Sequence, residues 1–151
     1  DGVEDRAGPA CVVAEGNLPW ITLGIPGTDA WGNRLRYRVT PAFTNSATGI
    51  QLTSVGTLSV NNELGIAVAV NVPVIILSHG QNAWGATSGG GAVIALPPAT
   101  NLNERENTDG DNLFVDSKPT TAAAVAGEYD DILTWLPGSI LFSRMLEAGK
   151  L

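Results

Sequence analysis

The longest apolar run in the chain is residues 64–77, LGIAVAVNVPVIIL, in which only Asn71 and Pro73 resist burial in a sheet. Most of the other residues are small or β-branched, and branched side chains pack well on a pleated surface but lose rotamer freedom in a helix. The run is also too short to span a bilayer as a helix, which takes about 20 apolar residues. Because proline cannot donate to a strand ladder, we expect two strands, residues 66–70 and 74–77.

Patterns on either side of this run predict further short elements. Strict alternation of apolar and polar residues indicates a strand with one wet face, and apolar residues three to four apart indicate a helix. On this basis we expect an ordered loop at residues 1–28, strands at residues 34–39, 50–60 and 113–115, a strand or helix at residues 129–136, and helices at residues 101–107 and 139–148. Successive strands with short connections favour antiparallel pairing, so the sequence predicts an α+β fold.

Composition narrows the class of protein. The 151 residues fit one domain, and only 15% of them are charged while Gly and Pro number 18 and 9, which favours turns and short strands over a helical bundle. The formal net charge of −7 excludes a nucleic-acid partner, which needs a basic surface. Cys11 is the single cysteine, so no disulfide can close within these residues.

Three short motifs resemble one known family. Residues 29–33, DAWGN, followed by Tyr37, are similar to the D-P-W-G-N-x-x-x-Y segment of type II secretion pseudopilins, which are close relatives of type IV pilins; alanine replaces the usual proline. Residues 77–82, LSHGQN, resemble that family's S-L-G-A-D-G loop, and Asp131 with Trp135 matches its closing D-I-x-x-W. The motifs also follow one another in the family's order.

The resemblance implies the head domain of a pilin or pseudopilin, residues 1–151, with an antiparallel sheet of about four strands and short helices. It implies a structural subunit and not an enzyme, assembling with other pilin or pseudopilin subunits into the helical filament of a type IV pilus or a type II secretion pseudopilus. The family's long N-terminal helix, which sits in the inner membrane before assembly, is missing from this sequence. The head would then be periplasmic, or extracellular in a finished pilus, and would take no small-molecule substrate.

Without that helix, part of the apolar sheet face should lie bare or be covered by residues 140–146. The final helix and residues 85–108 depart from the compact pseudopilin pattern. The alternative is a free-standing calcium- or carbohydrate-binding module, which would need no upstream helix. Trp20, Trp84 and Trp135 are spread over three segments, so we expect anchors of core and turns instead of a sugar platform.

The resemblance also implies a calcium site. Its matching positions are the carbonyls of Leu77 and Ser78 together with the side chains of Asn82 and Asp131. Calcium takes six to eight oxygen ligands, and a glycine-rich loop offers carbonyls readily. Asn82 stands where the family has aspartate, which removes one charge. The alternative is that Asp131 only caps a turn or forms a salt bridge.

A second acidic stretch, residues 104–111, invites an EF-hand interpretation. If Gly110 takes loop position six, Arg105 falls at position one and Asp116 at position twelve. Arginine cannot ligate calcium, so this frame fails. We expect a turn with solvated carboxylates.

An enzyme would have to use His79, the single histidine. A serine at position 78, 88 or 117, together with His79 and Asp131, would supply the three residue types of a hydrolase triad. However, the chain has no G-x-S-x-G elbow to expose such a serine, so we predict no catalysis.

Arg34, Arg36 and Arg38 place three guanidinium groups on one face of the strand at residues 34–39. In a chain of net charge −7, such a stripe would suit an acidic neighbour in a filament. The alternative is an ordinary solvated strand face.

Overall fold

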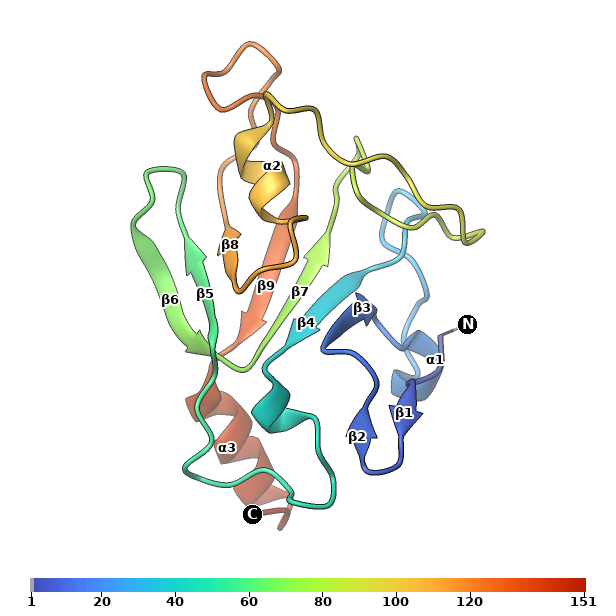
Figure 1. Cartoon of the computed structure of the whole chain (residues 1–151), viewed down its shortest axis with the longest axis vertical. Coiled ribbons are helices and arrows are strands. Elements are labelled where there is room, and N and C mark those ends of the chain that lie inside the picture. Colours follow the sequence, from blue (N-terminus) through green and yellow to red (C-terminus); the bar gives the residue numbers. More distant parts are fainter. Residues whose placement is uncertain (1) are drawn as a thin grey trace.

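A computed structural model describes residues 2–151, which form an α+β fold with three sheets (Figure 1). The strands are β1 (Arg6–Ala7), β2 (Ala10–Cys11), β3 (Glu15–Asn17), β4 (Arg36–Val39), β5 (Leu58–Asn61), β6 (Ala67–Val72), β7 (Val74–Ser78), β8 (Leu113–Val115) and β9 (Ile132–Leu136). The helices are α1 (Trp20–Leu23), the 3₁₀ turn η1 (Pro41–Phe43), α2 (Leu102–Glu106) and α3 (Gly138–Glu147). Across residues 2–151, no helix has the length and apolar character needed to cross a membrane. The expected class, α+β with short helices, is confirmed.

The largest sheet has four strands in the order β3-β4-β7-β9, and every pair in it is antiparallel. β7 lies at its centre, where it pairs with β4 on one side and β9 on the other. Pro73 separates β6 from β7, as expected from its missing N–H group. The two strands, however, belong to different sheets, because the chain turns sharply at Asn71, whose φ is +56°.

The second sheet has three strands in the order β6-β5-β8. β5 pairs with β6 in antiparallel orientation but with β8 in parallel orientation, so the expectation of antiparallel pairing is wrong for this pair. The cause is the connection: β8 does not follow by a short turn but only after the long segment that contains α2. The strand expected at residues 50–60 shortens to β5, because Leu52 and Val55 lie in exposed loop with no sheet face to bury them.

The core lies between these two sheets. Its buried residues are Leu58, Val60 and Val72 of one sheet, Ile75, Leu77 and Leu133 of the other, and Phe114 of β8. Because side chains alternate across a strand, the opposite face of the four-stranded sheet carries a second apolar set. That set, Tyr37, Val39, Val74, Ile76 and Leu136, is only half-buried. The four-stranded sheet therefore has one closed face and one open face.

Candidate functional site

Three carboxylates meet at the end of β7, next to the start of β9. Glu104 comes from α2, while Asp130 and Asp131 directly precede β9. One oxygen of each lies within 4.8 Å of an oxygen of the other two. We call these three residues the acidic corner. Glu104 and Asp131 are buried, with exposed fractions of 0% and 5%.

Glu104 is the one buried residue of α2, so the inner face of this short helix is a carboxylate and not an apolar side chain. Its oxygens accept hydrogen bonds from the side-chain amides of Asn82 (2.6 Å) and Asn101 (2.8 Å) and from the backbone N–H of Asp130 (3.2 Å). The expected solvated turn is therefore wrong for Glu104. It holds for Asp109 and Asp111, which are exposed.

The surroundings of Glu104 favour its neutral form. Burial raises the pKa of this carboxyl, and the charge of Asp131 raises it further, while the bonds from Asn82 and Asn101 act in the opposite direction. Two like charges about 4 Å apart repel by about 4 kcal/mol at an effective dielectric constant of 20. At neutral pH the acidic corner is therefore stabilised by a proton or by a bound cation.

Asp131 is held by residues from two other segments. Its Oδ2 accepts a hydrogen bond from the Asn107 side chain (2.8 Å), and its Oδ1 lies 3.6 Å from Nδ1 of His79, which is 1% exposed. Neither ring nitrogen of His79 finds a hydrogen-bond partner within residues 2–151. The Asn107 amide also bonds both the N–H and the carbonyl of Val115 in β8. Asn107 thereby ties the acidic corner to the second sheet.

Asp130 is fixed by the loop that follows β7. Its Oδ2 accepts hydrogen bonds from the backbone N–H groups of Gln81 and Asn82, both at 2.9 Å. Its Oδ1 is buried without a hydrogen bond in the described part of the chain. Gly80 makes this approach possible: its φ is +58°, and a Cβ atom there would lie 2.2 Å from Asp130 Oδ1.

Two of the four predicted calcium ligands, Asn82 and Asp131, do reach the acidic corner. Leu77 and Ser78 lie in β7, paired with Leu133 and Ile132 of β9, so their backbone belongs to the ladder beside it. The Ser78 hydroxyl donates to Asp29 at 2.6 Å, which joins this corner to the DAWGN turn. Calcium ligation by the Leu77 and Ser78 carbonyls stays a prediction.

Sequence reasoning missed Glu104, which is the centre of the corner. A signal was present: Asn101 and Glu104 have the Asn-x-x-Glu spacing seen at helix starts. Here the asparagine side chain bonds the glutamate directly, and no side-chain capping bond to the backbone forms. The contacts of Asn107 with Asp131 and Val115 had no sequence signal, because they join segments far apart in the chain.

The acidic corner fits a hard divalent cation. Calcium binds oxygen at about 2.3–2.6 Å, so oxygens that share one ion lie no more than about 5 Å apart. The 4.8 Å limit within the corner agrees with this spacing. The three carboxylates would be its ligands.

The corner offers no pair of nucleophile and base. The Ser78 hydroxyl bonds Asp29, and the Ser117 hydroxyl donates to the carbonyl of Lys118. Because both His79 nitrogens lack a hydrogen bond in the described region, no serine there is activated by this imidazole.

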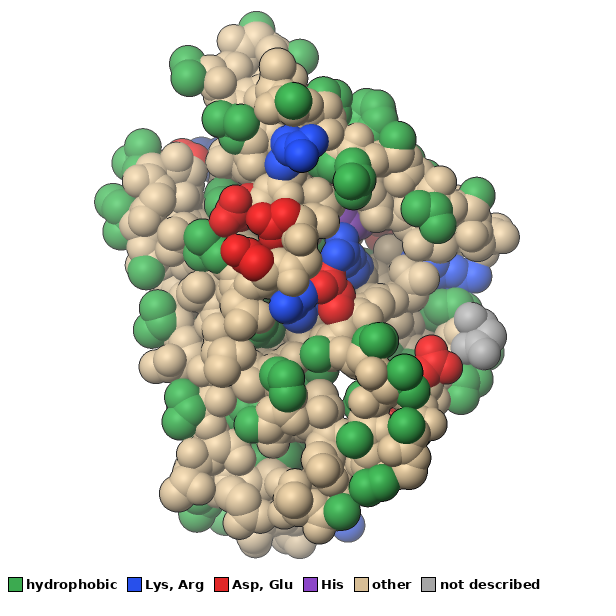
Figure 2. Space-filling view, viewed as in Figure 1, with side chains coloured by type: hydrophobic (Ala, Val, Ile, Leu, Met, Phe, Trp, Pro, Cys, Tyr) green, Lys and Arg blue, Asp and Glu red, His purple; other side chains and the backbone are tan. Residues whose placement is uncertain are grey.

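The arginine stripe is used inside the molecule. Arg36 and Arg38 form ion pairs with Glu15 of the neighbouring strand β3. Arg34 stacks on Trp20, with 3.8 Å from its guanidinium carbon to the ring centroid, and donates to the carbonyls of Gly27 and Gly89. A purely solvated strand face therefore does not describe these side chains, and docking to an acidic neighbour stays a prediction. Figure 2 shows basic and acidic side chains side by side on the face of the molecule that carries α2.

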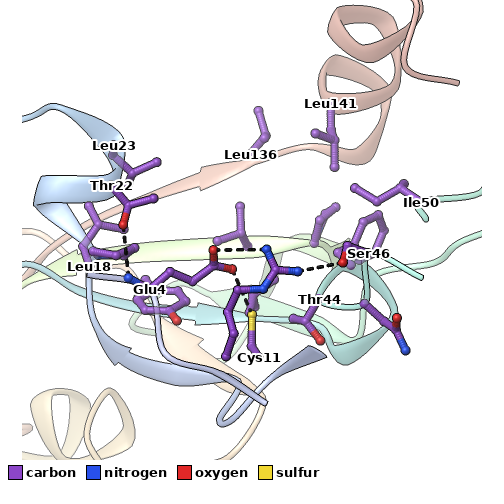
Figure 3. Close-up of a pocket in the computed structure, with 18 of the residues that line it drawn as sticks. Glu4, Cys11, Leu18, Thr22, Leu23, Thr44, Ser46, Ile50, Leu136 and Leu141 are labelled. Carbon is purple, nitrogen blue, oxygen red and sulfur yellow. Dashed lines mark hydrogen bonds and ion pairs between the residues drawn. The ribbon is translucent and has the colours of Figure 1, made fainter. Parts of the chain in front are cut away.

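The open face of the four-stranded sheet forms the second candidate site. It is the floor of a groove of about 500 Å³, which we call the sheet groove (Figure 3). Leu136 of β9 and Leu141 of α3 point into it from one side, and Leu18 and Leu23 beside and within α1 line the other. The remaining apolar lining is Tyr37, Val39, Phe43, Ile50 and Val74.

Polar groups gather at one end of the sheet groove. Arg6 forms an ion pair with Glu4 (3.6 Å) and donates to the Ser46 hydroxyl (2.7 Å), while Cys11 donates to Glu4 at 3.5 Å. Burial, and then the contact with Glu4, raises the pKa of the Cys11 thiol. The groove is therefore an apolar channel with a single polar end.

Comparisons of this chain with protein-family models, with curated proteins and with solved structures find no match.

Proposed function

We propose that this chain is the head domain of a structural filament subunit, a pilin or pseudopilin. The observation that carries the proposal is the open apolar face of the four-stranded sheet, which forms the floor of the sheet groove. An apolar sheet face that is left open in a groove suits the packing of another element. Subunits of this class need such a face for the helix that joins the head to the filament core.

The occupant we assign to the sheet groove is an amphipathic helix encoded upstream of Asp1. The groove is walled by α1 on one side and α3 on the other, and a helix presents one apolar stripe to such a channel. The chain also starts at this place: the carbonyl of Gly2 accepts from Ile21 of α1, and Glu4 lines the groove. A helix that precedes Gly2 therefore needs no long linker to reach it.

The proposed helix also places the protein in the cell. Its apolar first half anchors the subunit in the inner membrane, with the head in the periplasm, until the helix enters the filament core. Identical heads then meet by heterologous contacts that do not close. The filament is either a type II secretion pseudopilus or a type IV pilus, and in the second case the finished head is extracellular.

The acidic corner has a structural part in this proposal. It joins the loop after β7, the helix α2 and the start of β9 through side-chain hydrogen bonds. Calcium bound by Glu104, Asp130 and Asp131 would neutralise the three charges and fix these segments. The proposed role of the ion is stability of the head, not catalysis.

The test of the proposal is a charge placed in the sheet groove of the full-length gene product. Leu136→Asp should abolish filament incorporation, because a carboxylate cannot be buried against an apolar helix stripe without a partner. Val93→Asp is the matched control, since Val93 is 84% exposed and lies outside the groove. Sheared filaments are measured by immunoblotting. Full incorporation of Leu136→Asp with a normally folded head would refute the proposal.

The coding sequence upstream of Asp1 gives a second, independent check. The proposal requires a short basic leader and then a long apolar helix with an early glutamate. A different upstream sequence would favour the free-standing binding module. The acidic corner supports a calcium-binding module. A carbohydrate-binding module has little support, because Trp20 is covered by Arg34 and Trp31, at 45% exposure, is a single exposed ring.

A further inference from the structure

The strand β6 leaves one side of the second sheet open. The strand order is β6-β5-β8, so β6 pairs with β5 only and forms an outer edge of the molecule (Figure 1). A free edge presents unpaired backbone N–H and C=O groups, which are a template for another strand. This edge is distinct from the sheet groove, and its use does not depend on the proposed function.

The side chains of this edge are apolar and exposed. Val68 and Val70 of β6 are 52% and 60% exposed. Leu64, in the preceding turn, and Ile66, just before the strand, are 75% and 60% exposed. Residues 64–72 contain no charge and no proline. Proteins often protect free edges with lysine, proline, a covering loop or β-bulges. β6 has none of the first three within the strand, and its irregularities are two register shifts in the pairing with β5, between Leu58 and Val60 and between Val60 and Asn61.

Two other edges of the two sheets, β8 and β3, are protected. On β8, the Asn107 side chain bonds both backbone groups of Val115, as a neighbouring strand would. On β3, the sequence Glu-Gly-Asn is polar, and Glu15 is occupied by Arg36 and Arg38. The remaining edge strand, β9, exposes Ile132 at 55%, whereas β6 and the residues just before it expose four large apolar side chains, so β6 has the longer exposed apolar edge.

We propose that β6 pairs in antiparallel orientation with β6 of a second copy of this chain. Residues 66–70, IAVAV, read large-small-large-small-large in both directions, so the strand is complementary to itself. Opposite residues in an antiparallel pair point to the same face, so outward side chains must meet outward side chains. A two-fold axis at Val68 achieves this: Ile66 faces Val70 of the partner copy, and Ala67 faces Ala69.

The charge distribution predicts how salt acts on this dimer. Each copy carries a formal net charge of −7, but the pairing strands carry none. Association therefore buries apolar side chains while two negative bodies repel each other. Added salt screens that repulsion and should strengthen the dimer, whereas a contact made by ion pairs would weaken.

Sedimentation equilibrium on residues 1–151 tests the pairing. We expect a monomer–dimer equilibrium whose dissociation constant falls with added salt. Val68→Lys should raise that dissociation constant at least about tenfold. Val93→Lys is the matched control and should leave the dissociation constant unchanged. Val93 is also an exposed valine, but it lies outside β6. A wild-type chain that stays monomeric at millimolar concentration would overturn the proposal, and so would equal dimerisation by Val68→Lys. Circular dichroism verifies that each variant folds.

Disulfide trapping in a Cys11→Ser background tests the register. Facing Cα atoms in antiparallel strands lie about 4.5–5.5 Å apart, within the range for a disulfide. Val68→Cys should crosslink to itself. Ile66→Cys and Val70→Cys should crosslink efficiently when mixed and poorly alone. Equal crosslinking by Ile66→Cys alone, or by Val93→Cys, would contradict the antiparallel register.

Discussion

The two faces of the four-stranded sheet have the same apolar character but different surroundings. On the closed face, Leu133 of β9 packs with Ile75 and Leu77 against the second sheet. On the open face, Leu136 of the same strand stays half-buried in the sheet groove. The difference does not lie in the strands themselves. It lies in what covers them, since the second sheet comes from this chain and no element of residues 2–151 covers the groove fully.

Two identical truncations on β9 test most directly whether the two faces differ in packing. Leu133→Ala should lower the free energy of unfolding by about 2–5 kcal/mol, because it removes a packed core side chain and leaves a cavity. Leu136→Ala should cost less than about 1 kcal/mol in residues 1–151, since this side chain is only partly buried and lines an open groove. Urea denaturation measures both values. Equal losses would mean that the open face is as well packed as the closed one.

A glycine pair tests whether the acidic corner holds the end of the closed face. Gly80→Ala should cost about 2–3 kcal/mol, because it adds left-handed strain and displaces Asp130 from the N–H groups that it accepts. Gly8→Ala is the control: Gly8 has a similar φ, +63°, but nothing within 4 Å of the added Cβ. It should cost only the strain, about 1 kcal/mol. The two losses are compared by thermal and urea unfolding, and equal losses would show that the contact with Asp130 is unimportant.

Calcium should stabilise the closed side of the molecule but not the groove. At pH 7.5, saturating calcium should raise the stability by about 1–3 kcal/mol relative to a chelator, as expected for an ion that binds only the folded state. Asp131→Asn should abolish this gain. Glu63→Gln is the control, because Glu63 is exposed and, among residues 2–151, belongs to no group of carboxylates that could share an ion. A melting temperature that does not change with the chelator would show that calcium does not stabilise the fold.

The smallest effect expected is a pH trend. The folded-state pKa of Glu104 is raised above its unfolded value by burial, so its neutral form favours the folded state. That contribution is complete below the unfolded pKa and is lost as the pH rises through the folded pKa. In chelator, the melting temperature should therefore rise as the pH falls from neutral toward 5. In calcium the trend should flatten or reverse, because protons compete with the ion for these oxygens.

Local sequence patterns predicted most helices and strands, but they did not predict the contacts between segments that are distant in the sequence. The apolar run split by Pro73 gave β6 and β7 correctly, because a missing N–H is a property of one residue. Three features required contacts distant in sequence: the parallel pairing of β8 with β5, the short polar strand β3, and the burial of Glu104. Within the acidic corner, Asp131 and Asn82 were predicted through a motif. Glu104 was misjudged, because charge in a turn normally indicates solvent.

The parallel pair has a consequence for the order of folding. Ser59 of β5 pairs with Leu113 of β8, roughly fifty residues further along the chain. β7 pairs with β9 over a similar separation in sequence. During synthesis, the β5–β6 hairpin therefore emerges long before the strands that close the core. Until β8 and β9 leave the ribosome, its apolar side chains are exposed on both sides. The nascent chain should depend on a chaperone, or on rapid completion, to avoid premature strand exchange.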